Sequence, residues 1–136
     1  MSTRGKTCWQ GMNWISQHKR LAIYMRDGFS CVWCGSTLES GITLSLDHVV
    51  CHCKTANNDE TNLVTCCKSC NDSRGARTAN KFAVAVAMYI NHGVKAEAIL
   101  ANVHRARRRV LAKFLDDAKA AIALRGSCFN VLKGRK

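Results

Sequence analysis

Two Cys-x-x-Cys pairs constrain the fold of this chain more than any other feature of its sequence. Cys31 and Cys34 form the first pair, and Cys67 and Cys70 form the second. Four thiolates presented by two tight turns can form a closed tetrahedral site for a structural zinc ion. Buried free thiols are the alternative interpretation of the same residues. We expect the four cysteines to bind zinc and so to tie two distant segments of the chain together.

The total of nine cysteines also raises the possibility of a disulfide-stapled secreted domain. That number is odd, however, and the first ten residues, MSTRGKTCWQ, contain no apolar secretory segment. No run of apolar residues reaches the roughly 18 that a membrane span requires. The sequence therefore predicts a soluble cytoplasmic protein with metal-bound cysteines, and its 136 residues predict a single domain.

Positive charge is concentrated in the C-terminal part of the chain. The net charge is +12, and residues 77–136 hold thirteen basic and three acidic residues, against eight and six in residues 1–76. Such a charge attracts nucleic acids, anionic membranes or acidic proteins. Because no lipidation motif or large apolar face accompanies the basic residues, we expect no membrane role and favour DNA as the partner.

Hydrophobic spacing divides the chain into helical ends and an extended middle. A helix is predicted from about Asn13 to Arg26, and two short strands are predicted to form a hairpin within residues 29–50. Residues 52–61 are polar and predict a loop, and a further helix is expected to start near residues 69–71.

The remaining residues predict two more helices, from about Asn80 to Asn91 and from about Lys95 to Leu124. In the second, apolar residues recur every three or four positions and predict one continuous stripe packed on the rest of the protein. The stripe consists of Ile99, Val103, Ala106, Val110, Phe114, Ala118 and Ile122.

The runs KRLAIYMRDGFS, CVWCG, LDHVV and NLVTCCKSCNDSRG occur in that order between residues 18 and 75. Together they resemble the HNH endonuclease family of the zinc-ribbed ββα-metal type, which includes small free-standing phage and bacterial nucleases. The resemblance implies an α+β fold in which a ββα-metal core with a four-cysteine zinc site (29–78) lies between an N-terminal arm and helix (1–28) and a basic helical extension (79–136).

Phosphodiester hydrolysis needs a base to activate water and a cation to stabilise charge on the phosphate. His48 is the candidate base, because an imidazole can be neutral at physiological pH. Asp47 and Asn71 offer oxygen ligands for a catalytic divalent cation, with Mg²⁺ or Mn²⁺ expected. By resemblance to the family, Asn62 braces the loop and orients the histidine. Arg74 lies one helical turn after Asn71, where it could clamp the scissile phosphate or be a solvated residue at the helix end.

Adjacent residues of a regular strand point to opposite faces, so Asp47 and His48 cannot both line one site from an ideal strand. We therefore expect the strand to end or twist at this pair. Cys51, His52 and Cys53 follow closely, at a place where relatives often carry proline, and they could bind a second metal or contact substrate.

Two functions from different classes fit these features. The first is a metal-dependent HNH endonuclease that nicks or cuts DNA, with zinc in a structural role. The second is a non-catalytic zinc-containing module that binds nucleic acid. The presence of Asp47, His48, Asn62 and Asn71 together favours the enzyme. The sequence does not indicate which bases, if any, the protein recognises. It also leaves open whether the protein forms a homodimer or binds a phage or host protein.

Overall fold

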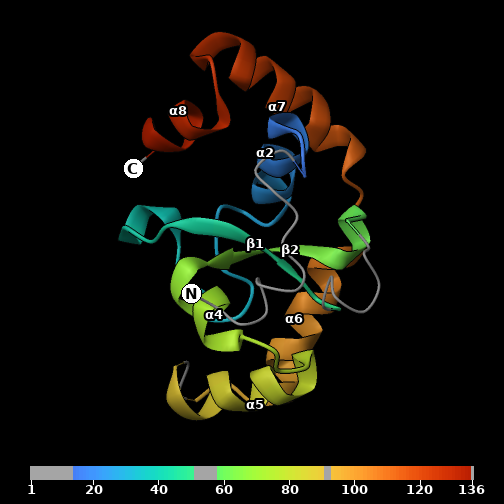
Figure 1. Cartoon of the computed structure of the whole chain (residues 1–136), viewed down its shortest axis with the longest axis vertical. Helices are drawn as coiled ribbons and strands as arrows, with labels where there is room; N and C mark the ends of the chain where they lie inside the picture. The colour runs from blue at the N-terminus through green and yellow to red at the C-terminus, as the bar shows by residue number, and fades with distance from the viewer. Residues whose placement is uncertain (1–13, 51–57, 91–92, 136) are drawn as a thin grey trace.

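The computed structural model describes residues 14–50, 58–90 and 93–135 (Figure 1). Within these ranges the chain forms six α-helices and one two-stranded antiparallel sheet, so the fold is mixed α and β, as the sequence predicts. The strands are β1 (Leu44–His48) and β2 (Leu63–Cys67). The helices are α2 (Gln17–Arg26), α4 (Lys68–Arg74), α5 (Ala79–Tyr89), α6 (Ala96–Arg108), α7 (Ala112–Arg125) and α8 (Cys128–Lys133).

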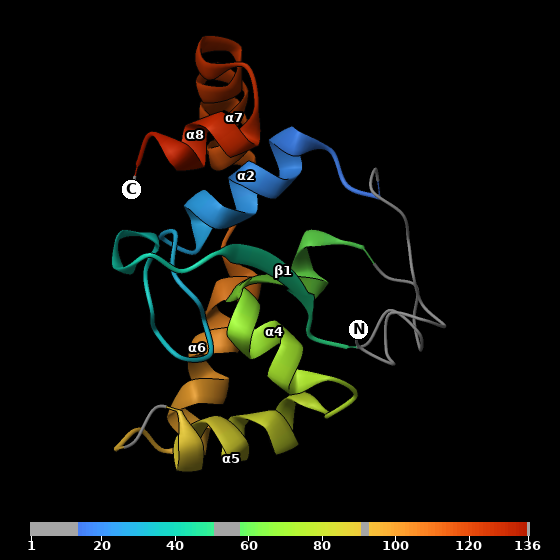
Figure 2. The same ribbon diagram turned by 60° about the vertical axis from the view of Figure 1, so that its left-hand side comes forward.

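The sheet separates two hydrophobic cores (Figures 1 and 2). Helices α2, α7 and α8 cover one face, and α4, α5 and α6 lie on the other side. We call the core on the side of α2, α7 and α8 the α2 core, and the core on the other side the α5–α6 core. Strand alternation explains the division, because Leu44 and Leu46 belong to the α2 core while Val64 and Cys66 belong to the α5–α6 core. Each face of the small sheet is therefore buried, and side chains of neighbouring strand residues enter different environments.

Helix α2 begins later than the sequence predicts. Its N-cap is Ser16, whose hydroxyl accepts a hydrogen bond from the amide of Lys19 at 3.1 Å. The predicted first residue, Asn13, lies outside the described residues. The helix ends at Arg26, next to the predicted stop at Asp27-Gly28, and Gly28 adopts a φ of +70°.

The predicted hairpin within residues 29–50 is wrong in its pairing. Only the second of the two segments forms a strand, β1, and its partner is β2, with Leu44 opposite Cys67 and His48 opposite Leu63. The first segment makes a single bridge between Ser30 and Thr37 and then a 3₁₀ turn. The alternating pattern correctly indicated a strand in the second segment, but the partner of that strand is β2, which follows the loop after His48.

The predicted long helix from Lys95 to Leu124 is two helices. Helix α6 ends at Arg108, Arg109 is extended with ψ 135°, and α7 begins at Ala112. Val110, expected in the apolar stripe, is 71% exposed, and Leu111 is buried in its place. The break lets α6 pack into the α5–α6 core and α7 into the α2 core.

Helix α5 lies close to its predicted span, whereas the short helix α8 was not foreseen. Thr78 caps α5 by accepting from the amide of Lys81, and Ser127 caps α8 in the same way from Asn130. Of the helices described, none combines the length and apolar character needed to cross a bilayer.

Candidate metal centre and the Asp-His segment

The four cysteines of the two pairs converge on one point. Their sulfur atoms all lie within 4.8 Å of one another, and the sulfurs of Cys34 and Cys67 are 3.8 Å apart. A tetrahedral zinc ion with Zn–S bonds of about 2.3 Å has sulfur–sulfur edges of about 3.8 Å. Cys31, Cys67 and Cys70 are buried and Cys34 is partly exposed. This four-cysteine cluster therefore has the ligand type, number and spacing of a structural zinc site, and it could hold such a metal.

Local hydrogen bonds support each half of the four-cysteine cluster. In the first turn, the Cys31 sulfur lies 3.5 Å from the amide of Cys34, and the Cys31 carbonyl accepts from Gly35 at 2.9 Å. In the second, Cys67 is the N-cap of α4, and its sulfur accepts from the amide of Cys70 at 3.4 Å. A metal here would join the first turn to the junction of β2 and α4.

Crowding of the thiols strongly alters their acidity. Hydrogen bonding from Cys31 lowers the pKa of Cys34, while hydrogen bonding with Cys34 and Cys66 raises the pKa of Cys31 to about 12. Hydrogen bonding with Cys31, together with burial, raises the pKa of Cys67, and hydrogen bonds with Cys31 and Cys34 raise that of Cys70. Metal binding requires the thiols to be deprotonated, so zinc binding at this cluster would release protons.

Asp47 belongs to β1, and its side chain is buried on the face of the sheet that packs against α4. Its Oδ2 accepts from the indole nitrogen of Trp33 at 3.1 Å and from Nη1 of Arg74. The side chain of Asp47 is 0% exposed and that of Arg74 only 2%. This carboxylate is therefore part of a buried ion pair.

Arg74, predicted to clamp the scissile phosphate or to be a solvated residue at the helix end, is buried and bridges α4 to the end of β1. Besides Asp47, it donates to the carbonyl oxygens of His48 at 2.9 Å, Val49 at 2.5 Å and Arg77 at 3.2 Å. Its guanidinium also lies 5.3 Å from the centre of the Trp33 ring. A guanidinium engaged in this way holds the end of β1 against α4.

His48 lies on the opposite side of β1 from Asp47. Its ring is 5.2 Å from that of Trp14, next to the α2 core, and its Nε2 is 2.8 Å from Oδ1 of Asn58. In the tautomer that donates from Nε2 to this amide oxygen, Nδ1 is the basic nitrogen of the neutral ring. The imidazole is only 7% exposed.

Strand β1 ends at His48, as the sequence predicts for this pair, but the side chains of Asp47 and His48 still lie on opposite faces. His48 is still paired with Leu63, so the alternation of a regular strand persists through it. The structure therefore brings together Asp47, Asn71 and Arg74 on the α4 face and places His48 on the other face. On the α4 face, Asn71 donates from Nδ2 to the hydroxyl of Ser45, two residues before Asp47.

Asn62 closes the loop that follows His48. Its side chain accepts from the amide of Val50 at 2.9 Å and donates to the carbonyl of Val50 at 3.0 Å, while its own carbonyl accepts from Val49. Asn62 is 2% exposed. These bonds brace the two ends of the segment between β1 and β2. Cys51, His52 and Cys53 belong to this segment but lie outside the described residues, as does Cys8.

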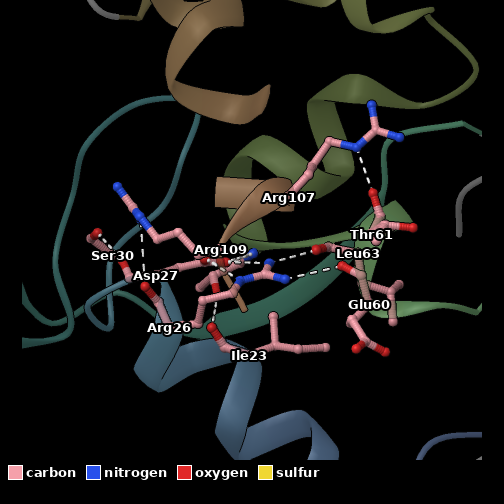
Figure 3. Close-up of polar contacts among 10 residues, drawn as sticks. Ile23, Arg26, Asp27, Ser30, Glu60, Thr61, Leu63, Arg107 and Arg109 are labelled. Carbon is pink, nitrogen blue, oxygen red and sulfur yellow. Dashed lines mark hydrogen bonds and ion pairs between the residues drawn. The ribbon is translucent and has the colours of Figure 1, made fainter. Parts of the chain in front are cut away.

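A second buried ion pair fixes the end of α2 against β2 (Figure 3). Arg26 donates to Oδ1 of Asp27 at 2.8 Å and to the carbonyl of Leu63 at 2.7 Å. Oδ2 of Asp27 accepts from the amide of Thr65 at 2.8 Å. The sequence suggested only a helix stop at Asp27. The pair instead sets the position of the strand that carries Cys67.

Sequence reasoning also missed Trp33, Trp14 and Asn58 as neighbours of the Asp-His pair. The indole of Trp33 is buried, at 1% exposure. A buried indole N–H needs an acceptor, and Asp47 provides it. The need for an acceptor predicts that the Trp33 indole has a hydrogen-bond partner, but only the folded structure identifies that partner as Asp47.

Comparison of the chain with family models, with curated proteins and with solved structures gives no match.

Proposed function

We propose that this protein is a metal-dependent endonuclease of the HNH type that hydrolyses phosphodiester bonds in DNA. The order of elements carries the proposal. Asp47 and His48 end the first strand, Asn62 braces the connecting loop, the second strand follows, and Asn71 lies on the helix after it. The four-cysteine cluster joins the strand–helix junction to the turn before β1.

In this proposal His48 is the general base. Its Nδ1 accepts a proton from water, the resulting hydroxide attacks phosphorus, and the bond from phosphorus to the 3′ oxygen breaks. Asp47 and Asn71 would hold a divalent cation, Mg²⁺ or Mn²⁺, which supplies charge stabilisation at the phosphate and the departing oxygen. Zinc at the four-cysteine cluster has a structural role.

The donor set fits a hard cation, since both side chains offer oxygen and both belong to the α4 face. Arg74 already neutralises Asp47 there, so cation and guanidinium compete for the same carboxylate. The proposal also requires the end of β1 to rearrange when substrate binds, because His48 starts on the other face. Catalytic contacts commonly form only in the substrate complex.

The engagement of Asp47 by Arg74 and Trp33 favours a second candidate, a zinc-containing module that binds nucleic acid without cutting it. In such a module the buried pair is only structural. The two candidates make opposite predictions about cleavage and the same prediction about binding.

Conversion of supercoiled plasmid DNA to nicked or linear forms distinguishes them. Zinc-loaded wild-type protein, His48→Ala and the matched control His18→Ala, on the exposed surface of α2, are incubated with and without Mg²⁺ or Mn²⁺. We expect cation-dependent cleavage that His18→Ala retains and His48→Ala reduces by about 100-fold or more. Equal cleavage by wild type and His48→Ala would remove His48 as the base. Binding without cleavage by the wild type would support the module.

A further inference from the structure

Two hollows meet beside the C-terminal end of α6. The larger, about 740 Å³, lies between residues 60–61 and the junction of α6 with α7. The smaller, about 280 Å³, lies between residues 49–50 and the segment joining α4 to α5. His104 and Arg107 line both hollows, so the two hollows lie side by side along these side chains. We call the two together the basic groove, after Arg77, His104, Arg107, Arg108 and Arg109.

The break after α6 assembles this groove. In a continuous helix, successive residues are about 100° apart, so Arg107, Arg108 and Arg109 would point in widely different directions. Because the helix ends at Arg108 and Arg109 is extended, all three line the larger hollow. These three consecutive basic residues therefore share one surface in the fold.

Positive charge in the groove is almost unopposed. Of the described residues lining it, Glu60 alone bears a carboxylate, and that group lies 3.9 Å from Nζ of Lys19. Arg74 also borders the smaller hollow, but its charge is matched by Asp47. Four other arginines remain to attract an anion.

These cations differ in how firmly they are held. Arg107 donates from Nε to the carbonyl of Thr61 at 2.5 Å, and its Nη1 is 3.3 Å from Nδ1 of His104. Figure 3 shows the Arg107 guanidinium above Thr61, with two nitrogens directed away from that bond. Arg77, which donates from Nη1 to the carbonyl of Ser73 at 3.2 Å, and Arg108 are both exposed. The groove thus combines an anchored guanidinium with two accessible ones.

The groove adjoins the Asp-His segment, because Val49 and Val50 line its smaller end. A chain of anions along the arginines would therefore approach the residues that directly follow His48.

We propose that the basic groove binds the sugar–phosphate backbone of DNA, with Arg77 and Arg108 contacting phosphates at its edges and Arg107 contacting one at its centre. The choice of DNA as the ligand rests on the proposed function, whereas the groove itself rests on the geometry above. Guanidinium groups suit this ligand since they donate two parallel hydrogen bonds to a phosphate. Backbone binding of this kind is independent of base sequence and weakens with salt.

Binding is measured by fluorescence anisotropy with a labelled duplex of about 20 base pairs and zinc-loaded protein, without Mg²⁺ or Mn²⁺, so that cleavage does not enter. The groove variant is Arg77→Gln/Arg108→Gln. The matched control is Lys119→Gln/Arg125→Gln, which removes the same charge from exposed positions on α7. Circular dichroism checks that both variants are folded.

We expect the groove variant to lose about tenfold in affinity and to lower the slope of log affinity against log salt by about 2, since each phosphate contact contributes about 0.9. The control should keep its affinity within about twofold. Equal losses in both variants would overturn the proposal, because the affinity would then follow net charge alone. Polyglutamate competing as well as unlabelled DNA at equal charge would also overturn it, in favour of a general polyanion surface.

These outcomes are independent of the nuclease assignment. Specific loss of binding in the groove variant supports the groove even if plasmid is never cut. Cleavage together with unchanged binding by the groove variant would support the nuclease and refute the groove.

Discussion

The buried pair between Asp47 and Arg74 allows a quantitative test of how the end of β1 is held. We consider a double-mutant cycle consisting of Asp47→Asn, Arg74→Met and the two together. Asp47→Asn keeps the side-chain shape but leaves the guanidinium buried without its counter-charge. Arg74→Met keeps much of the volume but leaves the carboxylate with only Trp33 as a donor among the contacts described above.

The magnitudes follow from burial and from the hydrogen bonds of Arg74. Breaking a buried ion pair by removing one partner costs about 3 to 5 kcal/mol. We therefore expect Asp47→Asn to lower the free energy of unfolding by about 3 kcal/mol. Arg74→Met should cost about 4 kcal/mol, because the carbonyls of His48, Val49 and Arg77 also lose a donor.

The double variant should lose about 4 to 5 kcal/mol, which is less than the sum of the single losses, so the coupling energy is about 2 to 3 kcal/mol. Urea unfolding of zinc-loaded proteins, followed by circular dichroism, measures each value.

The control is the exposed pair Lys68–Asp72 on the same helix, whose side chains are 68% and 64% exposed. The same cycle of Lys68→Met and Asp72→Asn should give a coupling of only about 0.5 kcal/mol. Additive losses at Asp47 and Arg74, or a coupling no larger than that of the control pair, would refute the view that burial makes this pair important.

Two further predictions concern other parts of the fold. Asn62→Ala removes both side-chain hydrogen bonds to Val50 and should lower the free energy of unfolding by about 1 to 3 kcal/mol. It should also speed limited proteolysis of the segment between β1 and β2. An unchanged rate of proteolysis would show that Asn62 does not brace this segment. Burial raises the pKa of Tyr24 above its ordinary 10.0, so its contribution to stability is full below about pH 10 and is lost as pH rises through the higher folded-state value. The free energy of unfolding, measured with urea from about pH 8 to 11, should therefore fall less steeply with pH for Tyr24→Phe than for wild type. Parallel curves for the two proteins would contradict this.

The parts of the fold that sequence predicted well depend on local signals. The cysteine spacing predicted the four-cysteine cluster, because each pair is closed by a local i, i+3 turn and the cluster then needs only those two turns to meet. Helix α5 was found near its predicted bounds, since its cap, Thr78, directly precedes it and its buried face, formed by Phe82, Ala83 and Val86, lies within it.

The errors arose where a distant segment decides the structure. Residues 29–50 alternate like a hairpin, yet β1 pairs with β2 across the loop after His48. Likewise the apolar spacing from Ile99 to Ile122 suits one helix, but its two halves enter different cores and the chain bends at Val110.

The candidate site was predictable as a set of residues but not as an arrangement. Sequence placed Asp47, Asn71 and Arg74 near one another, yet the pairing of Arg74 with Asp47 depends on how α4 packs against β1. The pairing of His48 with Asn58 depends on the return of the loop. Such polar contacts between separate segments leave no periodic signal in a single sequence.

The central claim is that the four-cysteine cluster binds one metal ion that closes the middle of the chain, and native mass spectrometry tests it most directly. Wild-type protein expressed in zinc-supplemented medium should carry one zinc ion per chain. Cys34→Ser should lose it and unfold more readily, because a structural zinc contributes up to about 10 kcal/mol to folding. Cys128→Ser, which alters a buried thiol in the other core, should retain the ion. A zinc-free wild type, or a Cys34→Ser variant that binds zinc as the wild type does, would contradict the account.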